Sequence, residues 1–190
     1  MYIIFGLGNP GPQYEMTRHN VGYMVLDELV KRYDVLFKRG NGPFEASACY
    51  FNDHQILFVK PLTFMNLSGE AVSFLIDEYN FHDYSKLLVV LDDINLPFGT
   101  IRLRPYGSDG GQKGLRSIID ALEDRGIPRL RIGIGDNFSD AVDYVLSPFT
   151  AKEREDLPLI LKHAVDAVES FIEEGIGLTM SRYNRNFLDQ

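Results

Sequence analysis

Short apolar runs alternate along the chain with amphipathic stretches of helical period. The apolar runs are rich in Val, Ile, Leu and Phe and are bounded by Gly, Pro, Asn or Asp. They predict six strands, at residues 3–8, 46–51, 55–60, 87–91, 100–104 and 130–134. The second and third strands are separated by Asn52 and Asp53, which are typical of a hairpin turn.

Four amphipathic stretches predict helices between and after these strands. Apolar positions at i, i+3 and i+4 spacing mark helices around residues 21–30 and 67–79, and a third helix is expected over 115–122. The last helix has the clearest limits, because Thr150 and Glu153 are spaced as a capping box and Gly175 stands where a C-terminal cap is expected. The order of elements predicts a three-layer α/β/α sandwich, and the hairpin makes its central sheet mixed and only partly parallel.

Length and composition favour one domain over residues 1–190. A chain of 190 residues with 45% apolar residues buries roughly 70% of its surface without disulfides. Cys49 is the only cysteine, which excludes an intramolecular disulfide and favours a reducing compartment. The sequence has no run of 18 apolar residues, and residues 1–5 lead directly into a strand-like segment without the basic stretch of a signal peptide. We therefore expect a cytoplasmic protein without membrane contact.

The distribution of charge along the chain bears on whether this protein binds a nucleic acid. A net charge of −8 argues against a nucleic-acid partner, because affinity for phosphates comes mostly from Lys and Arg. Residues 100–135, however, carry +3, against −5 before them and −6 after them. Seven positive side chains lie there, and six of them either form one basic face or are ordinary solvated charges; these six are Arg102, Arg104, Lys113, Arg116, Arg129 and Arg131.

The glycine-rich run at residues 6–11 fits the spacing of a dinucleotide-binding fingerprint but lies in the wrong context. The fingerprint needs a helix that opens at its third glycine, whereas Pro10 and Pro12 bracket Gly11 and the helical period starts only near Val21. We therefore expect no nucleotide cofactor. The glycines instead allow a tight turn that holds Asn9 at the carboxyl end of the first strand.

Two further segments carry side chains suited to acid–base chemistry. His19 lies just before the first helix, where it is either a proton carrier or an ordinary capping or surface histidine. Asp92 and Asp93 end a buried strand, where a carboxylate orients a base, holds a metal or simply begins a turn. The other histidines are scattered without ligand spacing, so we expect no metal site.

Two loops have the composition of a binding groove. Phe64 and Met65 are apolar residues outside any periodic stripe, which suits a substrate groove, and Asn66 beside them is either a helix N-cap or a substrate ligand. The glycine-rich run at 107–114 leads into a helix, and such a loop lets a polymer backbone approach closely.

Five blocks together resemble the bacterial-type peptidyl-tRNA hydrolase family. They are Gly6-Leu7-Gly8-Asn9-Pro10-Gly11, Thr17-Arg18-His19-Asn20-Val21-Gly22, Lys60-Pro61 with Thr63-Phe64-Met65-Asn66-Leu67-Ser68-Gly69, Asp92-Asp93 with Leu96-Pro97-Gly99, and Arg129-Leu130-Arg131-Ile132-Gly133-Ile134-Gly135. The resemblance implies a monomeric esterase, without metal or cofactor, that cuts the ester between a nascent peptide and the ribose of its tRNA.

The resemblance also implies a role for individual residues. His19 matches the catalytic base, Asp92 its partner, and Asn9 and Asn66 the amides that position water and the peptide backbone. Substrate contacts are expected from Tyr14, Phe64, Met65, Asn66 and Lys113. Phosphates of the tRNA acceptor stem are expected to meet Arg102, Arg104, Lys113 and Arg131.

One position departs from the family pattern. Gln112-Lys113 stands where many members have His-Asn, so the usual binding role does not transfer unchanged to Lys113. Two other functions remain open, namely a non-hydrolytic RNA-binding paralogue and a small-molecule esterase. The presence of Asn9, His19, Asn66 and Asp92 counts against the first, and the positive segment 100–135 is unnecessary for the second.

Overall fold

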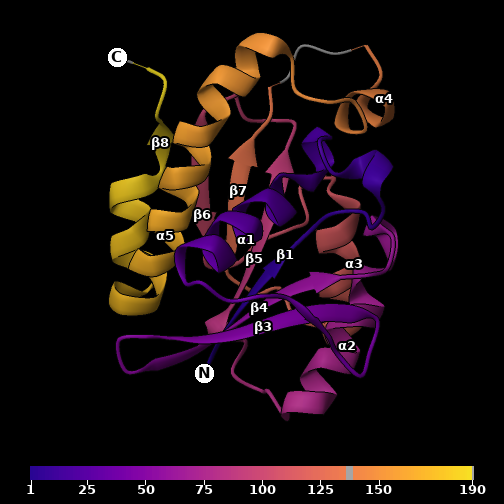
Figure 1. The fold of residues 1–190 in the computed structure, drawn as a ribbon, viewed down its shortest axis with the longest axis vertical. Coiled ribbons are helices and arrows are strands. Elements are labelled where there is room, and N and C mark those ends of the chain that lie inside the picture. Colours follow the sequence, from indigo (N-terminus) through magenta and orange to yellow (C-terminus); the bar gives the residue numbers. More distant parts are fainter. Residues whose placement is uncertain (136–138, 190) are drawn as a thin grey trace.

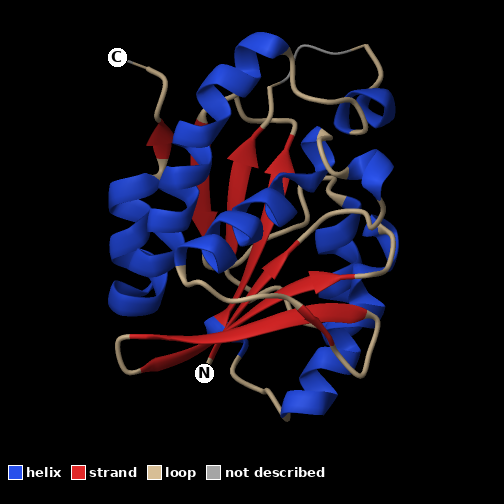
Figure 2. Ribbon diagram, viewed as in Figure 1, coloured by secondary structure: helices blue, strands red, loops and turns tan. Residues whose placement is uncertain are grey.

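A mixed sheet divides the molecule into layers, as Figures 1 and 2 show. The computed structural model describes residues 1–135 and 139–189, and within them the sheet has eight strands in the order β2-β3-β4-β1-β5-β7-β6-β8. The strands are β1 (Tyr2–Gly6), β2 (Lys38–Arg39), β3 (Phe44–Phe51), β4 (His54–Pro61), β5 (Leu87–Asp93), β6 (Thr100–Arg104), β7 (Arg129–Gly133) and β8 (Arg185–Asn186). The four central strands β4, β1, β5 and β7 are parallel, and the outer ones are antiparallel to their neighbours.

Helices cover both faces of this sheet. They are α1 (Val21–Arg32), α2 (Ser68–Tyr79), α3 (Lys113–Leu122), α4 (Ala141–Val145) and α5 (Ala151–Tyr183). Side chains of α1 and α5 form one core with alternate residues of the sheet, and side chains of α2 and α3 form a second core with the others. In β5, for example, Leu88 and Val90 face the first core while Leu87, Val89 and Leu91 face the second. The predicted α/β/α sandwich with a mixed sheet is confirmed.

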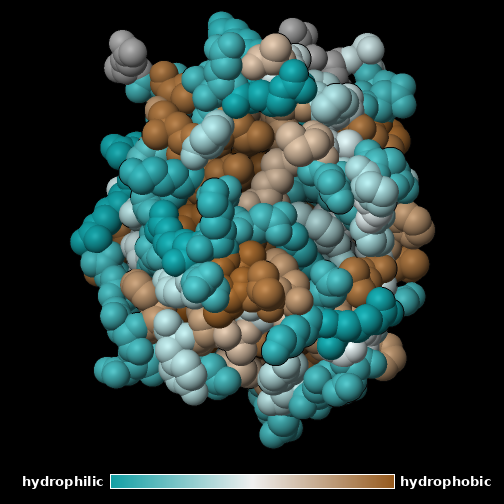
Figure 3. Space-filling view, viewed as in Figure 1, coloured by the Kyte–Doolittle hydropathy of each residue, from teal (hydrophilic) through white to brown (hydrophobic). Residues whose placement is uncertain are grey.

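The six predicted strands and the hairpin are present with small shifts of their ends. The predicted strand at 3–8 ends at Gly6, the one at 130–134 spans Arg129–Gly133, and the hairpin pairs Phe51 with His54. The capping box at the start of α5 is present, because Thr150 Oγ1 accepts from Glu153 N at 3.2 Å and Glu153 Oε2 accepts from Thr150 N at 2.7 Å. The face of the molecule drawn in Figure 3 is mostly hydrophilic and carries several hydrophobic patches.

Gly175 interrupts the last helix where the sequence predicts a cap, but a second helical segment follows it. Gly175 breaks the helical geometry with φ 77° and ψ 170°, but the chain resumes a helix that runs on to Tyr183. Ile176, Met180 and Tyr183 pack against the same core as the first part of α5. Their burial holds the chain in a second helical segment beyond the glycine.

The parallel strands bring distant segments to one edge of the sheet. Carboxyl ends of parallel strands meet at the same edge, so the residues that follow β1, β4 and β5 become neighbours there. The start of α1 comes close to this edge at Gly22, where an added Cβ would lie 2.5 Å from the carbonyl oxygens of both Leu7 and Val90. Glycine at that position lets the segment that carries His19 lie against the ends of β1 and β5.

Candidate active site

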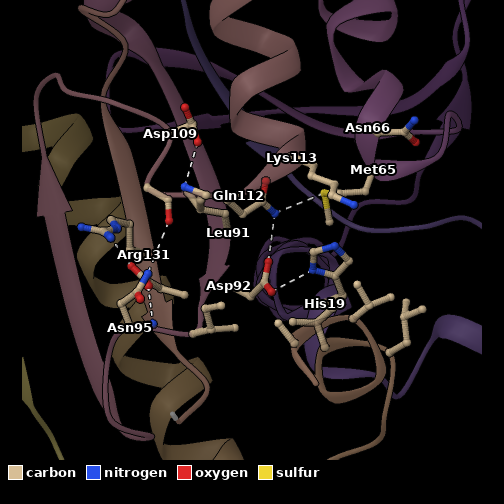
Figure 4. Close-up of a pocket in the computed structure, with 18 of the residues that line it drawn as sticks. His19, Met65, Asn66, Leu91, Asp92, Asn95, Asp109, Gln112, Lys113 and Arg131 are labelled. Atoms are coloured by element: carbon tan, nitrogen blue, oxygen red, sulfur yellow. Dashed lines mark hydrogen bonds and ion pairs between the residues drawn. The ribbon is translucent and has the colours of Figure 1, made fainter. Parts of the chain in front are cut away.

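A cavity of about 450 Å³ opens at this edge of the sheet. Its polar lining includes Asn9, His19, Asp92, Gln112 and Lys113, and Figure 4 shows most of them. Its apolar lining includes Phe64, Met65, Ile94, Ala141, Val142, Val145 and Leu146. Charged groups therefore stand beside an apolar wall, an arrangement that suits a ligand with both polar and apolar parts.

His19 and Asp92 form a hydrogen-bonded pair in this cavity. His19 lies in a short 3-10 turn, Arg18–Asn20, and its Nδ1 is 2.8 Å from Oδ2 of Asp92 at the end of β5. The Asp92 side chain is only 2% exposed and that of His19 is 14% exposed. In Figure 4 the other ring nitrogen points away from Asp92. The carboxylate thus fixes the ring and leaves Nε2 free to exchange a proton with a ligand.

The second oxygen of Asp92 is held from the opposite side. Gln112 Nε2 donates to Asp92 Oδ1 at 3.0 Å and also lies 3.2 Å from Met65 Sδ. The other end of the same side chain caps α3, because Gln112 Oε1 accepts from Leu115 N at 2.9 Å. Both oxygens of the buried carboxylate are therefore hydrogen-bonded.

Asn9 is fixed on three sides by neighbours from two other segments. Its backbone N donates to Asn20 Oδ1 at 2.9 Å, and its carbonyl accepts from Asn20 Nδ2 at 2.9 Å. Its side-chain Oδ1 accepts from Met65 N at 2.8 Å. These bonds set the orientation of the amide and leave its Nδ2 as the donor for a ligand in the cavity.

Arg18 anchors the apolar wall that α4 contributes. Its guanidinium donates to Ser147 Oγ and Pro148 O at 2.7 Å each and to Glu153 Oε2 at 2.6 Å, and it stacks over the ring of Tyr144. The side chain is 4% exposed. Because His19 is the next residue, this buried cation ties the position of the histidine to that of α4.

The arginines of β6 and β7 project from one face of the sheet but differ in their environment. The register pairs Arg102 with Arg131 and Arg104 with Arg129, so the four side chains share a face. Arg131 lines the cavity and forms an ion pair with Asp93, whose Oδ1 accepts from Asn95 N at 2.8 Å.

Arg129 does not belong to a basic face, and this part of the prediction is wrong. It is 2% exposed and donates to the carbonyl of Ser108, so the glycine-rich loop covers it. Burial, and then the nearby charge of Arg131, lower its pKa to about 10. Arg116 is exposed but lies 3.5 Å from Asp109. Arg102, Arg104 and Lys113 thus remain as the more accessible cations.

The described part of the chain, residues 1–135 and 139–189, holds neither a metal-binding cluster nor a membrane-spanning helix. There, no group of three or more His, Cys, Asp and Glu side chains is placed to hold a metal ion. No helix within those ranges is long and apolar enough to cross a membrane.

Known proteins are similar to this chain in sequence and fold over nearly their whole length. The sequence profile of the peptidyl-tRNA hydrolase family matches residues 3–190. The chain belongs to the peptidyl-tRNA hydrolase family. Among its relatives, the peptidyl-tRNA hydrolase of Carboxydothermus hydrogenoformans is 46% identical over 97% of this chain and 99% of its own. That of Thermodesulfovibrio yellowstonii is 42% identical over 97% of this chain and 100% of its own. The crystal structure of peptidyl-tRNA hydrolase from Acinetobacter baumannii superposes with a TM-score of 0.90 at 29% identity, over 97% of this chain and 94% of the other.

Most residues that the family resemblance singled out lie together. Asn9, His19, Phe64, Met65, Asn66, Asp92, Lys113 and Arg131 all line the cavity. Tyr14 is not among the residues that line the cavity, but its ring lies edge-on to that of Phe64, with 6.4 Å between centroids. Arg102 and Arg104 lie on β6, on the same face of the sheet as Arg131.

Asn66 does not cap a helix. The N-cap of α2 is Leu67, and Asn66 lies in the preceding 3-10 turn, Met65–Leu67, with its side chain exposed. In Figure 4 its amide lies apart from His19 and Asp92, beyond Met65. This position suits contact with a part of the substrate distant from the reacting bond.

Three parts of the site carry no clear signal in the sequence. In the sequence, Gln112 stands out only as a departure from the family pattern, and Arg18 and Asn20 only as members of a block. The five residues of α4 span little more than one turn, too few for an apolar stripe to show. The Asn-Val-Gly sequence after His19 is the one local hint that this turn packs tightly against the sheet.

Proposed function

We propose that this protein hydrolyses the ester between a peptide and the 3′-terminal ribose of tRNA, with His19 as general base. The observation that carries the proposal is the 2.8 Å contact between His19 and a buried Asp92 in a cavity of a peptidyl-tRNA hydrolase family member. A general base of this kind contributes about 10²–10⁴-fold to the rate.

The reaction needs one water molecule and two proton transfers. His19 Nε2 takes a proton from water as the water oxygen attacks the ester carbonyl, and Asp92 supports the imidazolium that forms. Collapse of the tetrahedral intermediate breaks the bond to the ribose oxygen, which receives the proton from Nε2. The products are a tRNA with a free ribose hydroxyl and a peptide with a free carboxyl group, which releases its proton to solvent at neutral pH. The mechanism uses no covalent nucleophile, no metal and no cofactor.

The peptide end of the substrate is assigned to the amides and the apolar wall. Asn9 offers Nδ2 to a peptide carbonyl, and Asn66 at the rim offers both a donor and an acceptor. Phe64, Met65 and α4 supply apolar surface for peptide side chains, with Tyr14 behind Phe64. An aminoacyl-tRNA without an N-acyl group lacks the peptide bond that Asn9 would recognise.

The tRNA end is assigned to the accessible cations of the β6–β7 face and α3, together with Arg131, which lines the cavity in an ion pair with Asp93. Arg102, Arg104, Lys113 and Arg131 are proposed to hold phosphates of the acceptor stem, while the acidic remainder of the surface stays out of contact. Such contacts release counterions, so binding should weaken with salt. We further propose that the enzyme acts as a monomer in the cytoplasm, where ribosomes generate its substrate.

Steady-state hydrolysis of N-acetyl-aminoacyl-tRNA tests the proposal, with unblocked aminoacyl-tRNA and an N-blocked small ester as comparison substrates. We expect the first substrate to be cleaved far faster than the other two, and the rate on prefolded tRNA to survive a chelator. Binding without cleavage would favour a non-hydrolytic RNA-binding protein. Equal rates on the small ester would favour a small-molecule esterase. Loss of activity with chelator, restored by Mg²⁺ or Zn²⁺, would contradict the metal-free mechanism.

A further inference from the structure

We propose that Gln112 is a positioning residue for the His19–Asp92 pair, and that it holds Asp92 through a neutral donor whose orientation the start of α3 dictates. The inference rests on the proposed function and deepens it, because it assigns a role to the position that departs from the family pattern.

The orientation of the Gln112 amide follows from its partners. A backbone N–H only donates, so the end of the side chain that meets Leu115 N at 2.9 Å must be Oε1. The opposite end is then the NH₂ group, which faces Asp92 Oδ1 at 3.0 Å and Met65 Sδ at 3.2 Å. One side chain therefore connects the first turn of α3, the end of β5 and the turn that contains Met65.

This connection matters because Asp92 has little other means of holding its orientation. Its side chain is 2% exposed, and its two oxygens are bound by His19 and by Gln112. Rotation of the carboxylate would break the contact with His19 Nδ1, and the Gln112 bond on the opposite oxygen opposes that rotation. An amide has no titration near neutral pH, so this restraint stays constant while His19 gains and loses its proton.

Because of the charges around the His19–Asp92 pair, a carboxylate at position 112 tests the role of the Gln112 donor. The charged groups that line the cavity with His19 are Asp92, Asp93, Asp109, Lys113 and Arg131. Asp93 forms an ion pair with Arg131, and Asp109 lies near Arg116. A Glu at position 112 would keep an oxygen to cap Leu115 N, but it would replace the donor that faces Asp92 by a carboxylate oxygen and so add a negative charge beside the pair.

The experiment compares Gln112→Glu with Gln55→Glu, the same change at an exposed position of β4 outside the cavity. For Gln112→Glu, kcat on N-acetyl-aminoacyl-tRNA should fall on the order of 10- to 100-fold, the size expected for losing a hydrogen bond to a charged group, with KM nearly unchanged. The acid limb of the pH profile of kcat/KM should move to higher pH, because a second carboxylate stabilises the protonated imidazole. Gln55→Glu should change neither quantity.

The Gln112→Met variant is the control for a folding defect caused by the added charge of Gln112→Glu. It removes the donor without adding charge, so kcat should fall while the acid limb stays near its wild-type position. Wild-type kcat and an unmoved acid limb in Gln112→Glu would overturn the proposal, and so would a raised KM with unchanged kcat, which would mark a substrate contact. An inactive wild-type enzyme, or a fully active His19→Ala variant, would instead refute the proposed function itself.

Discussion

Replacing Asp92 by Asn should disable His19 through the tautomer of its ring as well as through lost charge. Gln112 Nε2 donates to the Oδ1 side of residue 92, so an amide there would turn its oxygen toward Gln112. Its NH₂ would then face His19 Nδ1, which lies 2.8 Å from the carboxylate in the native enzyme. The ring would have to accept at Nδ1 and carry its proton on Nε2, where the mechanism needs a free base.

The size of the effect follows from the bonds involved. Losing a hydrogen bond to a charged group costs about 1.5–3 kcal/mol, and turning the amide to restore the active tautomer would break the bond to Gln112, at about 1 kcal/mol more. The barrier should therefore rise by roughly 2.5–4 kcal/mol, which lowers kcat by about 10²–10³-fold. A comparable change in a Ser-His-Asp triad lowers kcat by about 10⁴ through the wrong tautomer.

The assay is steady-state cleavage of N-acetyl-aminoacyl-tRNA by the Asp92→Asn enzyme, with Asp120→Asn on the exposed side of α3 as the matched control. Thermal unfolding of both variants shows whether each is folded at the assay temperature. The control should keep wild-type kcat. A folded Asp92→Asn enzyme with kcat within fivefold of wild type would refute the reasoning about the tautomer and the role of Asp92.

Two other expectations follow from the buried and exposed arginines. Arg18→Met leaves Glu153 without its buried partner and should lower the free energy of unfolding by about 3 kcal/mol, as measured by urea denaturation. An unchanged midpoint would show that the anchoring of α4 by Arg18 does not contribute to stability. Arg104→Glu should raise KM for peptidyl-tRNA and reduce the slope of its salt dependence by roughly one, with kcat nearly unchanged, whereas Arg154→Glu on the exposed side of α5 should do neither. A fall in kcat at constant KM for Arg104→Glu would place this residue at the chemical step instead.

The sequence predicted the elements whose signals are local. β5 is a continuous apolar run that ends in two carboxylates, and α5 starts at a capping box, so both were identified from neighbouring residues alone. The strands β2 and β8 have two residues each, which is too short for alternation to show, and they are held by pairing with β3 and β6. Gly175 interrupts the helix as its position predicts, but nothing local in the sequence shows that a second helical segment packs against the same core beyond it.

The site was predictable as a set of residues but not as a network. Gln112 and Asp92 are 20 positions apart, and only the packing of α3 against the end of β5 shows that one amide serves both the helix cap and the carboxylate. Arg129 and Arg131 are the same residue type on one strand face, yet the glycine-rich loop covers the first and leaves the second in the cavity. Burial of this kind depends on a loop distant in sequence, so charge counting alone overestimates the basic face.

The central claim is that His19 is the general base, and the most direct measurement is the single-turnover rate of N-acetyl-aminoacyl-tRNA hydrolysis by a folded His19→Ala enzyme. We expect the rate of cleavage of the bound substrate to fall by about 10² or more, because water then lacks a base, while the dissociation constant for the substrate changes little. The His19 side chain is bound through its hydrogen bond to Asp92, so its removal leaves both cores intact and thermal unfolding should show a folded enzyme at the assay temperature. A single-turnover rate within a few-fold of wild type would contradict the assignment and with it the proposed mechanism.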